Sequence, residues 1–204
     1  MRADSRPIRL FRSTCRPRAW RSVRRPRCRA VVAILSLLVL VGAAPAHATS
    51  TGIAVHVGGG GAHSRVYELA VTRGWDWQHD LVGGWVVTGY WEGDLGYWRR
   101  ATPLPGKGRD VEEVGITPLV RARTDVGGTR VYFDIGVGAH LLHGVSNYHD
   151  RLSTAFEFSP ELGFGVALSH GWEVGYRLRH VSNAGIKEPN GGVNFNLLTV
   201  RREF

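Results

Sequence analysis

Cysteine is absent from residues 49–204, because both cysteines of the chain, Cys15 and Cys28, stand in its first 48 residues. Those first residues also hold eleven of the 26 basic residues and one of the 17 acidic residues, which leaves 15 basic and 16 acidic residues from position 49 onward. A segment without thiols has no disulfide, thiolate metal site or cysteine nucleophile. Its balanced charge is no basis for nucleic-acid binding, so we expect no nucleic-acid partner.

Long apolar runs are also scarce, and the one that stands out is AVVAILSLLVLVGAAPAHA, which ends at Ala48. It follows an arginine-rich stretch and ends in Ala46-His47-Ala48, which is the pattern of a secretory signal peptide and its cleavage site. A retained membrane anchor is the less favoured alternative, because the run is short for a helix that must span roughly 20 apolar residues. We predict a signal peptide over residues 1–48 and a single domain over residues 49–204.

The domain itself shows a strong period of two. In RVYFDIGVGAHL (130–141) apolar side chains alternate with polar or small ones, and FEFSPELGFGVALS (156–169) repeats the pattern. Successive residues of a strand point to opposite faces, so each segment predicts a strand with one apolar face. Six similar segments bring the number of expected strands to eight; they lie near 51–58, 65–77, 84–98, 111–123, 171–182 and 194–204.

Two architectures accommodate such strands. A soluble sandwich or lipocalin-like barrel would turn the apolar face inward, whereas an outer-membrane barrel would turn it toward lipid. Aromatic residues near the strand ends favour the membrane, and so does the aromatic Phe204 after the final strand, which resembles the sorting signal of bacterial outer-membrane barrels. The aromatics are Trp75, Trp77, Trp91, Tyr97 and Trp98. We therefore predict an all-β, eight-stranded antiparallel transmembrane β-barrel in the outer membrane of a Gram-negative cell.

A barrel of eight strands has an interior that side chains fill, so an open pore is not expected. Arg177 and Arg179 belong to the inward face of segment 171–182, and we expect them to pair with acids of the lumen such as Asp134, Glu157 or Glu173. The histidines show no spacing that is typical of a metal site. No metal and no cofactor are expected.

His180 and Ser182 end the outer face of the same segment. This is the seventh strand, so its C-terminal end is expected at the outer surface, where it meets the outer leaflet. A serine hydroxyl becomes a nucleophile when an adjacent base takes its proton, and an imidazole with a pKa near 6.5 suits that task. Alone, the pair is a weak signal, because histidine and serine commonly end strands as solvated residues.

The longer stretch HVSNAGIKEPNGG (180–192) resembles the signature of the lipid A 3-O-deacylase family (PagL type), which are eight-stranded outer-membrane esterases. The resemblance rests on His180, Ser182, Asn183, Ala184, Gly185, Lys187, Pro189, Asn190 and Gly192. It implies hydrolysis of the 3-linked acyl ester of lipid A in lipopolysaccharide. It also implies His180 as the base, Ser182 as the nucleophile, Asn183 as a contributor to the oxyanion hole, and Asn190 as a support of the loop. Apart from the resemblance, Asn183, Ala184 and Gly185 just past the serine offer an amide side chain and backbone N–H groups as donors to an oxyanion.

One position departs from the family pattern. Where the best-known form of the family has its triad glutamate, this chain has Asn194, on the strand expected beside His180. An asparagine accepts a hydrogen bond from an imidazole N–H but carries no charge to stabilise the imidazolium. Asn194 is our candidate for the third member of the triad, and Glu188 is the alternative.

The sequence is also compatible with two other functions. One is a small structural or adhesive eight-stranded barrel without catalysis, which would not need Ser182 or His180. The other is a lipid A acyltransferase that uses the same surface position. The oligomeric state is also open between a monomer and a homodimer.

Overall fold

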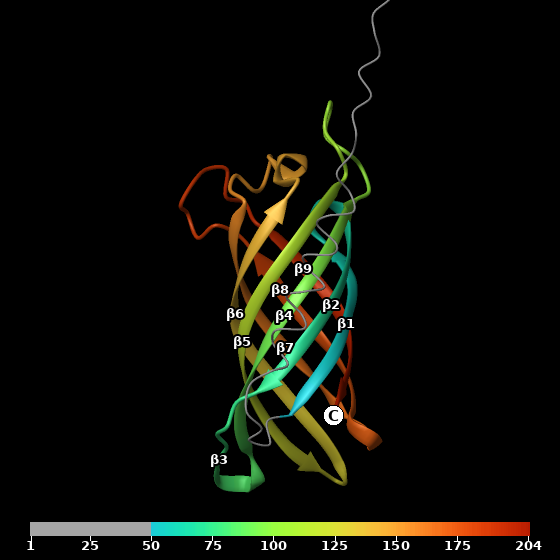
Figure 1. Ribbon diagram of the computed structural model, residues 1–204, viewed down its shortest axis with the longest axis vertical. Coiled ribbons are helices and arrows are strands. Elements are labelled where there is room, and N and C mark those ends of the chain that lie inside the picture. Colours follow the sequence, from blue (N-terminus) through green and yellow to red (C-terminus); the bar gives the residue numbers. More distant parts are fainter. Residues whose placement is uncertain (1–49) are drawn as a thin grey trace, which may run out of the picture. The chain divides into compact units, whose positions relative to one another are not determined.

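The computed structural model describes residues 50–204, and the predicted signal peptide lies outside the described residues. The described part forms a closed antiparallel barrel of eight long strands (Figure 1). These are β1 (Thr51–Gly60), β2 (Ser64–Gly74), β4 (Val86–Arg100), β5 (Asp110–Val126), β6 (Thr129–His143), β7 (Phe156–Ala167), β8 (Trp172–Val181) and β9 (Val193–Glu203). The eight predicted strands and the predicted fold class are confirmed.

Short elements connect the long strands. A ninth strand, β3 (His79–Asp80), pairs only with β4. The 3₁₀ turns are η1 (Gly61–His63), η2 (Val82–Gly84), η3 (Val145–Tyr148) and η4 (Ser169–Gly171). Among residues 50–204, no helix combines the length and the apolar composition that a membrane crossing requires.

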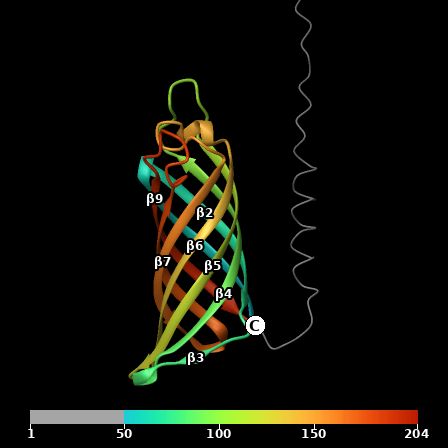
Figure 2. The ribbon, with the colours of Figure 1, turned by 90° about the vertical axis from the view of Figure 1, so that its left-hand side faces the viewer.

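The barrel closes where β1 meets β9, with Val55 opposite Val200. Every other long strand pairs with its neighbours in chain order, and β2 pairs with β4. Closure leaves no long strand with an unpaired edge, which is the condition for backbone N–H and C=O groups to lie in hydrocarbon. The connections 101–109, 144–155 and 182–192 gather at one end, which we call the loop end (Figure 2). The opposite end, with β3 and η4, is the turn end (Figure 1).

The two faces of the strands divide as the period of two predicts. In β6, Phe133, Ile135 and Val137 point outward and are 49%, 61% and 56% exposed, whereas Asp134 between them is 3% exposed. The apolar face is therefore the outer wall, and the polar face lines the lumen. The soluble alternative is wrong, because it would require the reverse.

The aromatic positions were predicted less well. Trp77, Trp91 and Tyr97 are exposed, as residues at a membrane interface would be. Trp98 is fully buried in the lumen, because it follows Tyr97 directly and neighbouring residues of a strand point to opposite faces. Trp75 directly follows the end of β2 at Gly74. Its ring lies over Gly89, where an added Cβ atom would be 1.9 Å from the ring.

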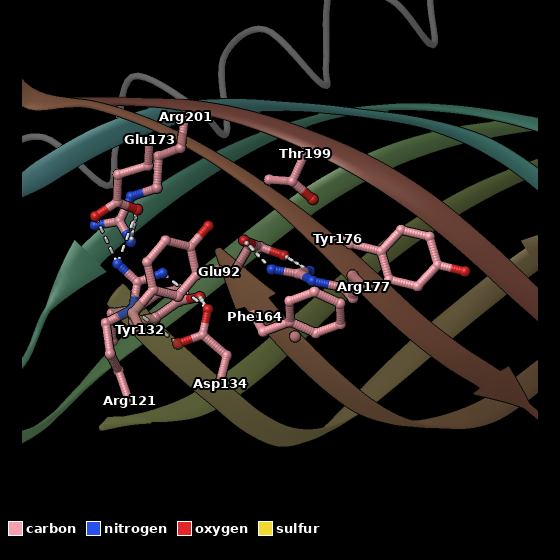
Figure 3. A pocket seen from close by; sticks show the side chains of 12 residues that line it. Glu92, Arg121, Tyr132, Asp134, Phe164, Glu173, Tyr176, Arg177, Thr199 and Arg201 are labelled. Atoms are coloured by element: carbon pink, nitrogen blue, oxygen red, sulfur yellow. Dashed lines mark hydrogen bonds and ion pairs between the residues drawn. The ribbon is translucent and has the colours of Figure 1, made fainter. Parts of the chain in front are cut away.

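Ion pairs fill the middle of the lumen. Arg121 binds Asp134 and Glu173 with hydrogen bonds of 2.7–2.8 Å (Figure 3). Arg177 binds Glu92 and Glu161. The cavity at this level is about 10 Å³, close to the space that one water molecule needs, so the barrel has no open channel here.

Arg177 and Arg179 point inward and pair with acids of the lumen, as predicted, but the acids named as examples are wrong. Arg177 binds Glu92 and Glu161, and Arg179 binds Glu68 and Glu113, in place of Asp134, Glu157 or Glu173. The acids on β2, β4 and β5 reach these arginines across the lumen. Which acid lies at which height depends on the tilt and stagger of the strands, which the sequence pattern alone does not provide.

An apolar cluster closes the lumen below the loop end. It consists of Val66, Trp98, Val111, Leu142, Tyr148, Leu152, Val181, Val193, Phe195 and Leu197. Tyr148 and Leu152 come from the connection 144–155 and are buried, so this connection covers the barrel. Val181 and Val193 point inward into the cluster and fix the faces of the residues beside them.

Candidate active site

His180 lies near the C-terminal end of β8, between the inward Arg179 and Val181. Its neighbour on the outer face, Leu178, is 43% exposed and belongs to the apolar wall. Because Val181 is anchored in the apolar cluster, His180 and Ser182 on either side of it share the outer face. Both residues are half-buried. The structure thus brings the predicted base and the predicted nucleophile to one face at the loop end.

Asn194 lies directly opposite His180 in the β8–β9 register. The distance from His180 Nδ1 to Asn194 Oδ1 is 2.5 Å. An amide oxygen only accepts hydrogen bonds, so Nδ1 carries the proton and donates it to Asn194. The other ring nitrogen, Nε2, then has a free lone pair. This is the tautomer that a general base needs.

Ser182 continues β8 by one residue beyond its end. Its N–H donates to Phe158 O at 3.0 Å, and its carbonyl accepts from Phe158 N at 2.8 Å, so β7 holds its backbone. Within residues 50–204, no hydrogen bond joins Ser182 Oγ to the His180 ring. Catalytic hydrogen bonds are often long or poorly aligned before substrate binds, so Ser182 remains the candidate nucleophile.

The connection 182–192 folds around Asn183, which is fully buried. Its side-chain NH₂ donates to Ser153 Oγ at 3.0 Å and to Lys187 O at 2.8 Å, and its Oδ1 accepts from Gly185 N at 3.0 Å. Asn190 Oδ1 accepts from Asn183 N at 3.0 Å. The side chains of Asn183 and Asn190 therefore both hold the shape of the loop.

One backbone N–H near Ser182 stands apart from this network. Ala184 has a φ of +54°, and its N–H has no hydrogen-bond partner among the described residues. The N–H groups of Asn183 and Gly185 on either side are already bonded within the loop. Between Ser182 and Lys187, Ala184 N–H is therefore the backbone donor for which the described structure gives no partner.

Glu188, the alternative third member, lies on the exposed part of the loop. Its Oε2 accepts a hydrogen bond from Asn190 N at 2.9 Å. Within the described residues its side chain has no contact with His180. The geometry favours Asn194 as the residue that orients the imidazole.

Two residues contribute to this site in ways that the sequence did not predict. Gly192 has a φ of +62°, and a Cβ atom there would lie 2.4 Å from His180 Cε1. Ser153 comes from another connection and bonds both Asn183 Nδ2 and Lys187 O. Gly192 belongs to the stretch 180–192 on which the resemblance rests. Ser153 has no signal in the sequence, because only the fold brings it to the loop.

An ion pair fastens the neighbouring connection. Arg100 donates two hydrogen bonds to the carboxylate of Asp150, at 2.8 and 3.0 Å. These hydrogen bonds hold the pKa of Asp150 below its usual range. Tyr148 of the same connection bonds Ser64 through its hydroxyl at 2.5 Å, and burial raises the pKa of that hydroxyl.

Comparisons with known proteins agree with this geometry. The family model described as Lipid A 3-O-deacylase (PagL) matches residues 65–203. The lipid A deacylase PagL of Bordetella bronchiseptica is 31% identical over 182 residues, which cover 84% of this chain and 93% of that protein. The lipid A deacylase PagL of Pseudomonas aeruginosa is 28% identical and covers 79% of this chain and 90% of its own length.

A solved structure shares the fold. The crystal structure of the outer membrane enzyme PagL superposes with a TM-score of 0.65 at 24% sequence identity, over 74% of this chain and 98% of that one. At this identity the likeness supports the architecture of the barrel. The sequence relatives support the family.

Proposed function

The chain belongs to the lipid A 3-O-deacylase (PagL) family, and on that premise we propose that it is a serine esterase whose reacting groups are Ser182 and His180. It is an outer-membrane enzyme that hydrolyses the 3-linked acyl ester of lipid A. The observation that carries the serine mechanism is the pair His180–Asn194 with Ser182 on the same outer face.

The position of the site fits a lipid substrate. We place the loop end at the cell surface, because outer-membrane barrels have their longer connections there. His180 and Ser182 then lie at the upper edge of the apolar wall, beside exposed side chains such as Leu178 and Phe156. The acyl chains of a lipid A molecule in the outer leaflet can pack on that wall while an ester group reaches Ser182.

The reaction follows from the donors and acceptors present. His180 Nε2 accepts the proton of Ser182 Oγ as the oxygen attacks the ester carbonyl carbon. The tetrahedral intermediate expels the 3-oxygen of the sugar, which takes the proton from His180 and leaves as a hydroxyl. Water then gives a proton to the same imidazole and attacks the acyl-serine. The bond from the acyl carbon to Ser182 Oγ breaks, Oγ takes the proton back from His180, and a free fatty acid is released.

The negative oxygen of the intermediate needs a donor. We propose that Ala184 N–H supplies it, because this group is unbonded and follows Ser182 by two residues. Asn183, Gly185 and Asn190 act indirectly by fixing the turn that presents Ala184. Contrary to our expectation, the side chain of Asn183 therefore does not donate to the oxyanion, since both hydrogens of its amide are already donated to Ser153 and Lys187.

Asn194 orients His180 without a negative charge. It fixes the tautomer and the plane of the ring, but the imidazolium that forms in the transition state gains less than it would from a carboxylate. All three side chains come from one barrel, so one chain suffices for the chemistry in either a monomer or a homodimer.

The direct test is mass spectrometry of lipid A from cells that express wild type, Ser182→Ala, His180→Ala or Ser169→Ala. Ser169 is an exposed serine at the turn end and serves as the matched control. We expect loss of the 3-linked acyl chain with wild type and Ser169→Ala only, and all four barrels should assemble. Full activity of Ser182→Ala would refute the serine mechanism, and transfer of the acyl group to another lipid instead of water would indicate an acyltransferase.

A further inference from the structure

A second histidine–serine contact lies inside the barrel, far from the outer face. His140 of β6 is 1% exposed, and its Nε2 lies 2.5 Å from Ser159 Oγ. Ser159 Oγ in turn donates to Glu161 Oε1 at 3.2 Å. Because the serine proton is directed to Glu161, the serine oxygen accepts from His140, and Nε2 carries the proton. The opposite ring nitrogen, Nδ1, faces two carboxylates.

Those carboxylates belong to Glu113 and Asp94. Glu113 Oε1 is 2.5 Å from His140 Nδ1, and Asp94 Oδ2 is 3.8 Å from it. Among the described residues none of these three atoms has a hydrogen-bond partner, and the short contact is an ion pair only if Nδ1 is protonated. All three side chains are at least nine-tenths buried. With the ring proton on Nε2, Nδ1 and the two carboxylate oxygens are three acceptor atoms that converge in a buried place, which is unfavourable unless a metal cation or a second ring proton lies among them.

The charge of the lumen points the same way. Eight carboxylates are buried in the barrel against four guanidinium groups. The carboxylates are Glu68, Glu92, Asp94, Glu113, Asp134, Glu157, Glu161 and Glu173, and the guanidinium groups are Arg121, Arg177, Arg179 and Arg201. Within residues 50–204, Asp94 has no arginine partner. A bound cation beside it would reduce the excess of negative charge.

Two glycines leave the space in which these groups meet. A Cβ atom on Gly115 would lie 2.2 Å from His140 Nδ1 and 2.7 Å from Asp94 Oδ1. A Cβ atom on Gly138 would lie 2.4 Å from His140 Nε2. Any larger residue at either position would displace the imidazole from the carboxylates.

We propose that Asp94, Glu113 and His140 bind one divalent transition-metal ion of the zinc class inside the lumen. One imidazole nitrogen with two carboxylate oxygens suits Zn²⁺ or Co²⁺, whereas Ca²⁺ takes oxygen ligands alone. The ligand atoms lie within 4.8 Å of one another. Their outer partners also fit, because Nε2–H of a metal-bound histidine donates to a neighbour, here Ser159, and Glu113 Oε2 accepts from Trp98 and Arg179.

The ion would have a structural role. Its ligands come from β4, β5 and β6, so it would join three neighbouring strands from inside the barrel. Trp98, which donates to Glu113, packs on Phe195 with ring centroids 4.7 Å apart. Phe195 directly follows Asn194, so the ion would brace the wall that carries the orienting residue. The proposal does not depend on the deacylase reaction, and its test does not use that activity.

The experiment measures bound metal in the untagged mature barrel, refolded in detergent with Zn²⁺, Co²⁺ or Ca²⁺ and then freed of excess ion. We expect about one Zn²⁺ or Co²⁺ per folded chain, with Co²⁺ absorption bands of nitrogen and oxygen ligation, and no retained Ca²⁺. Asp94→Asn should retain at least tenfold less metal per folded chain than wild type. Asp134→Asn is the matched control, because Asp134 is a buried carboxylate of the same lumen that binds Arg121 and Tyr90 instead.

Heat-modifiable gel mobility reports whether each variant is folded. The proposal is overturned if wild type retains less than about one Zn²⁺ or Co²⁺ per chain, or if it retains Ca²⁺ as well as it retains Zn²⁺. It is also overturned if folded Asp94→Asn retains as much metal as wild type, or if Asp134→Asn loses as much metal as Asp94→Asn. If Asp94→Asn fails to fold, the Co²⁺ spectrum of wild type decides, since ligation without nitrogen would exclude His140.

Discussion

His180 Nδ1 lies 2.5 Å from Asn194 Oδ1 across the last strand pair of the barrel, and this contact fixes which ring nitrogen is free to act as a base. The amide of Asn194 orients the His180 ring, whereas a carboxylate at this position would also supply a negative charge. The two contributions can therefore be separated by substitution at a single position.

We predict that Asn194→Ala lowers kcat about 10- to 100-fold, less than the roughly 10⁴-fold cost of losing a carboxylate orienter. Asn194→Asp should keep or raise kcat, because a carboxylate also stabilises the imidazolium. Deacylation rates in detergent measure both. An Asn194→Ala enzyme as fast as wild type would mean that another group orients His180, with Glu188→Ala as the next variant to assay.

Gly192 offers a test of how closely the loop fits the histidine. We predict that Gly192→Ala lowers kcat at least tenfold without preventing assembly, because the new methyl group would displace the His180 ring. Gly127→Ala is the control, since Gly127 has a similar φ of +60° but no atom within 4 Å of its Cβ position. Equal losses of activity in the two variants would assign the effect to backbone strain alone.

Ser153 should act on the site through the loop. Removing its hydroxyl deletes hydrogen bonds to Asn183 and Lys187, each worth about 1 kcal/mol. We expect Ser153→Ala to speed amide hydrogen exchange in residues 182–192 and to lower kcat several-fold. Faster exchange with unchanged kcat would show that the loop network is not needed for catalysis.

Asp150 makes the stability of the connection 144–155 depend on pH. Arg100 lowers the pKa of Asp150 in the folded protein, so the ion pair stabilises the folded connection at pH values above the ordinary pKa of about 3.9. This stabilisation is lost as pH falls through the lowered pKa. The pair is partly exposed, and its contribution is at most about 1 kcal/mol.

Hydrogen exchange of residues 144–155 measures this effect. Wild type should exchange more slowly than Asp150→Asn at pH 7, and the two should converge in acid once the rates are corrected for pH. Asp76→Asn, at an exposed position of the turn end, should behave as wild type. A difference that persists in acid after the Asp150 carboxylate has been protonated would contradict the ion-pair explanation.

We also predict that the mature protein begins near Thr49. The motif Ala46-His47-Ala48 after an apolar run motivates this position. Intact mass of the protein extracted from outer membranes should correspond to residues 49–204. A mass that includes the apolar run would indicate a retained anchor.

The strands and their faces could be predicted because alternation is a local property. Phe133 and Asp134 point to opposite sides whatever the rest of the chain does, and only the choice between lipid and core had to be inferred. The positions of His180, Ser182 and Asn194 followed from the same rule, applied to two adjacent strands.

Contacts across the lumen could not be predicted in this way. The partners of Arg177 and Arg179 come from strands far away in the sequence, at heights that the stagger of the closed barrel determines. The same holds for Asp94, Glu113 and His140, whose spacing fits no local metal motif because each stands on a different strand. Trp98 was placed at the interface by its residue type although its parity with Tyr97 turns it inward.

β9 lies between β8 and β1, so both of its edges are paired in the completed barrel. Asn194 meets His180 through the pairing of β9 with β8. A chain that has not yet folded contains all three side chains of the proposed site, but nothing holds the amide opposite the imidazole. On the proposed mechanism we therefore expect deacylation from the folded barrel and none from the unfolded chain.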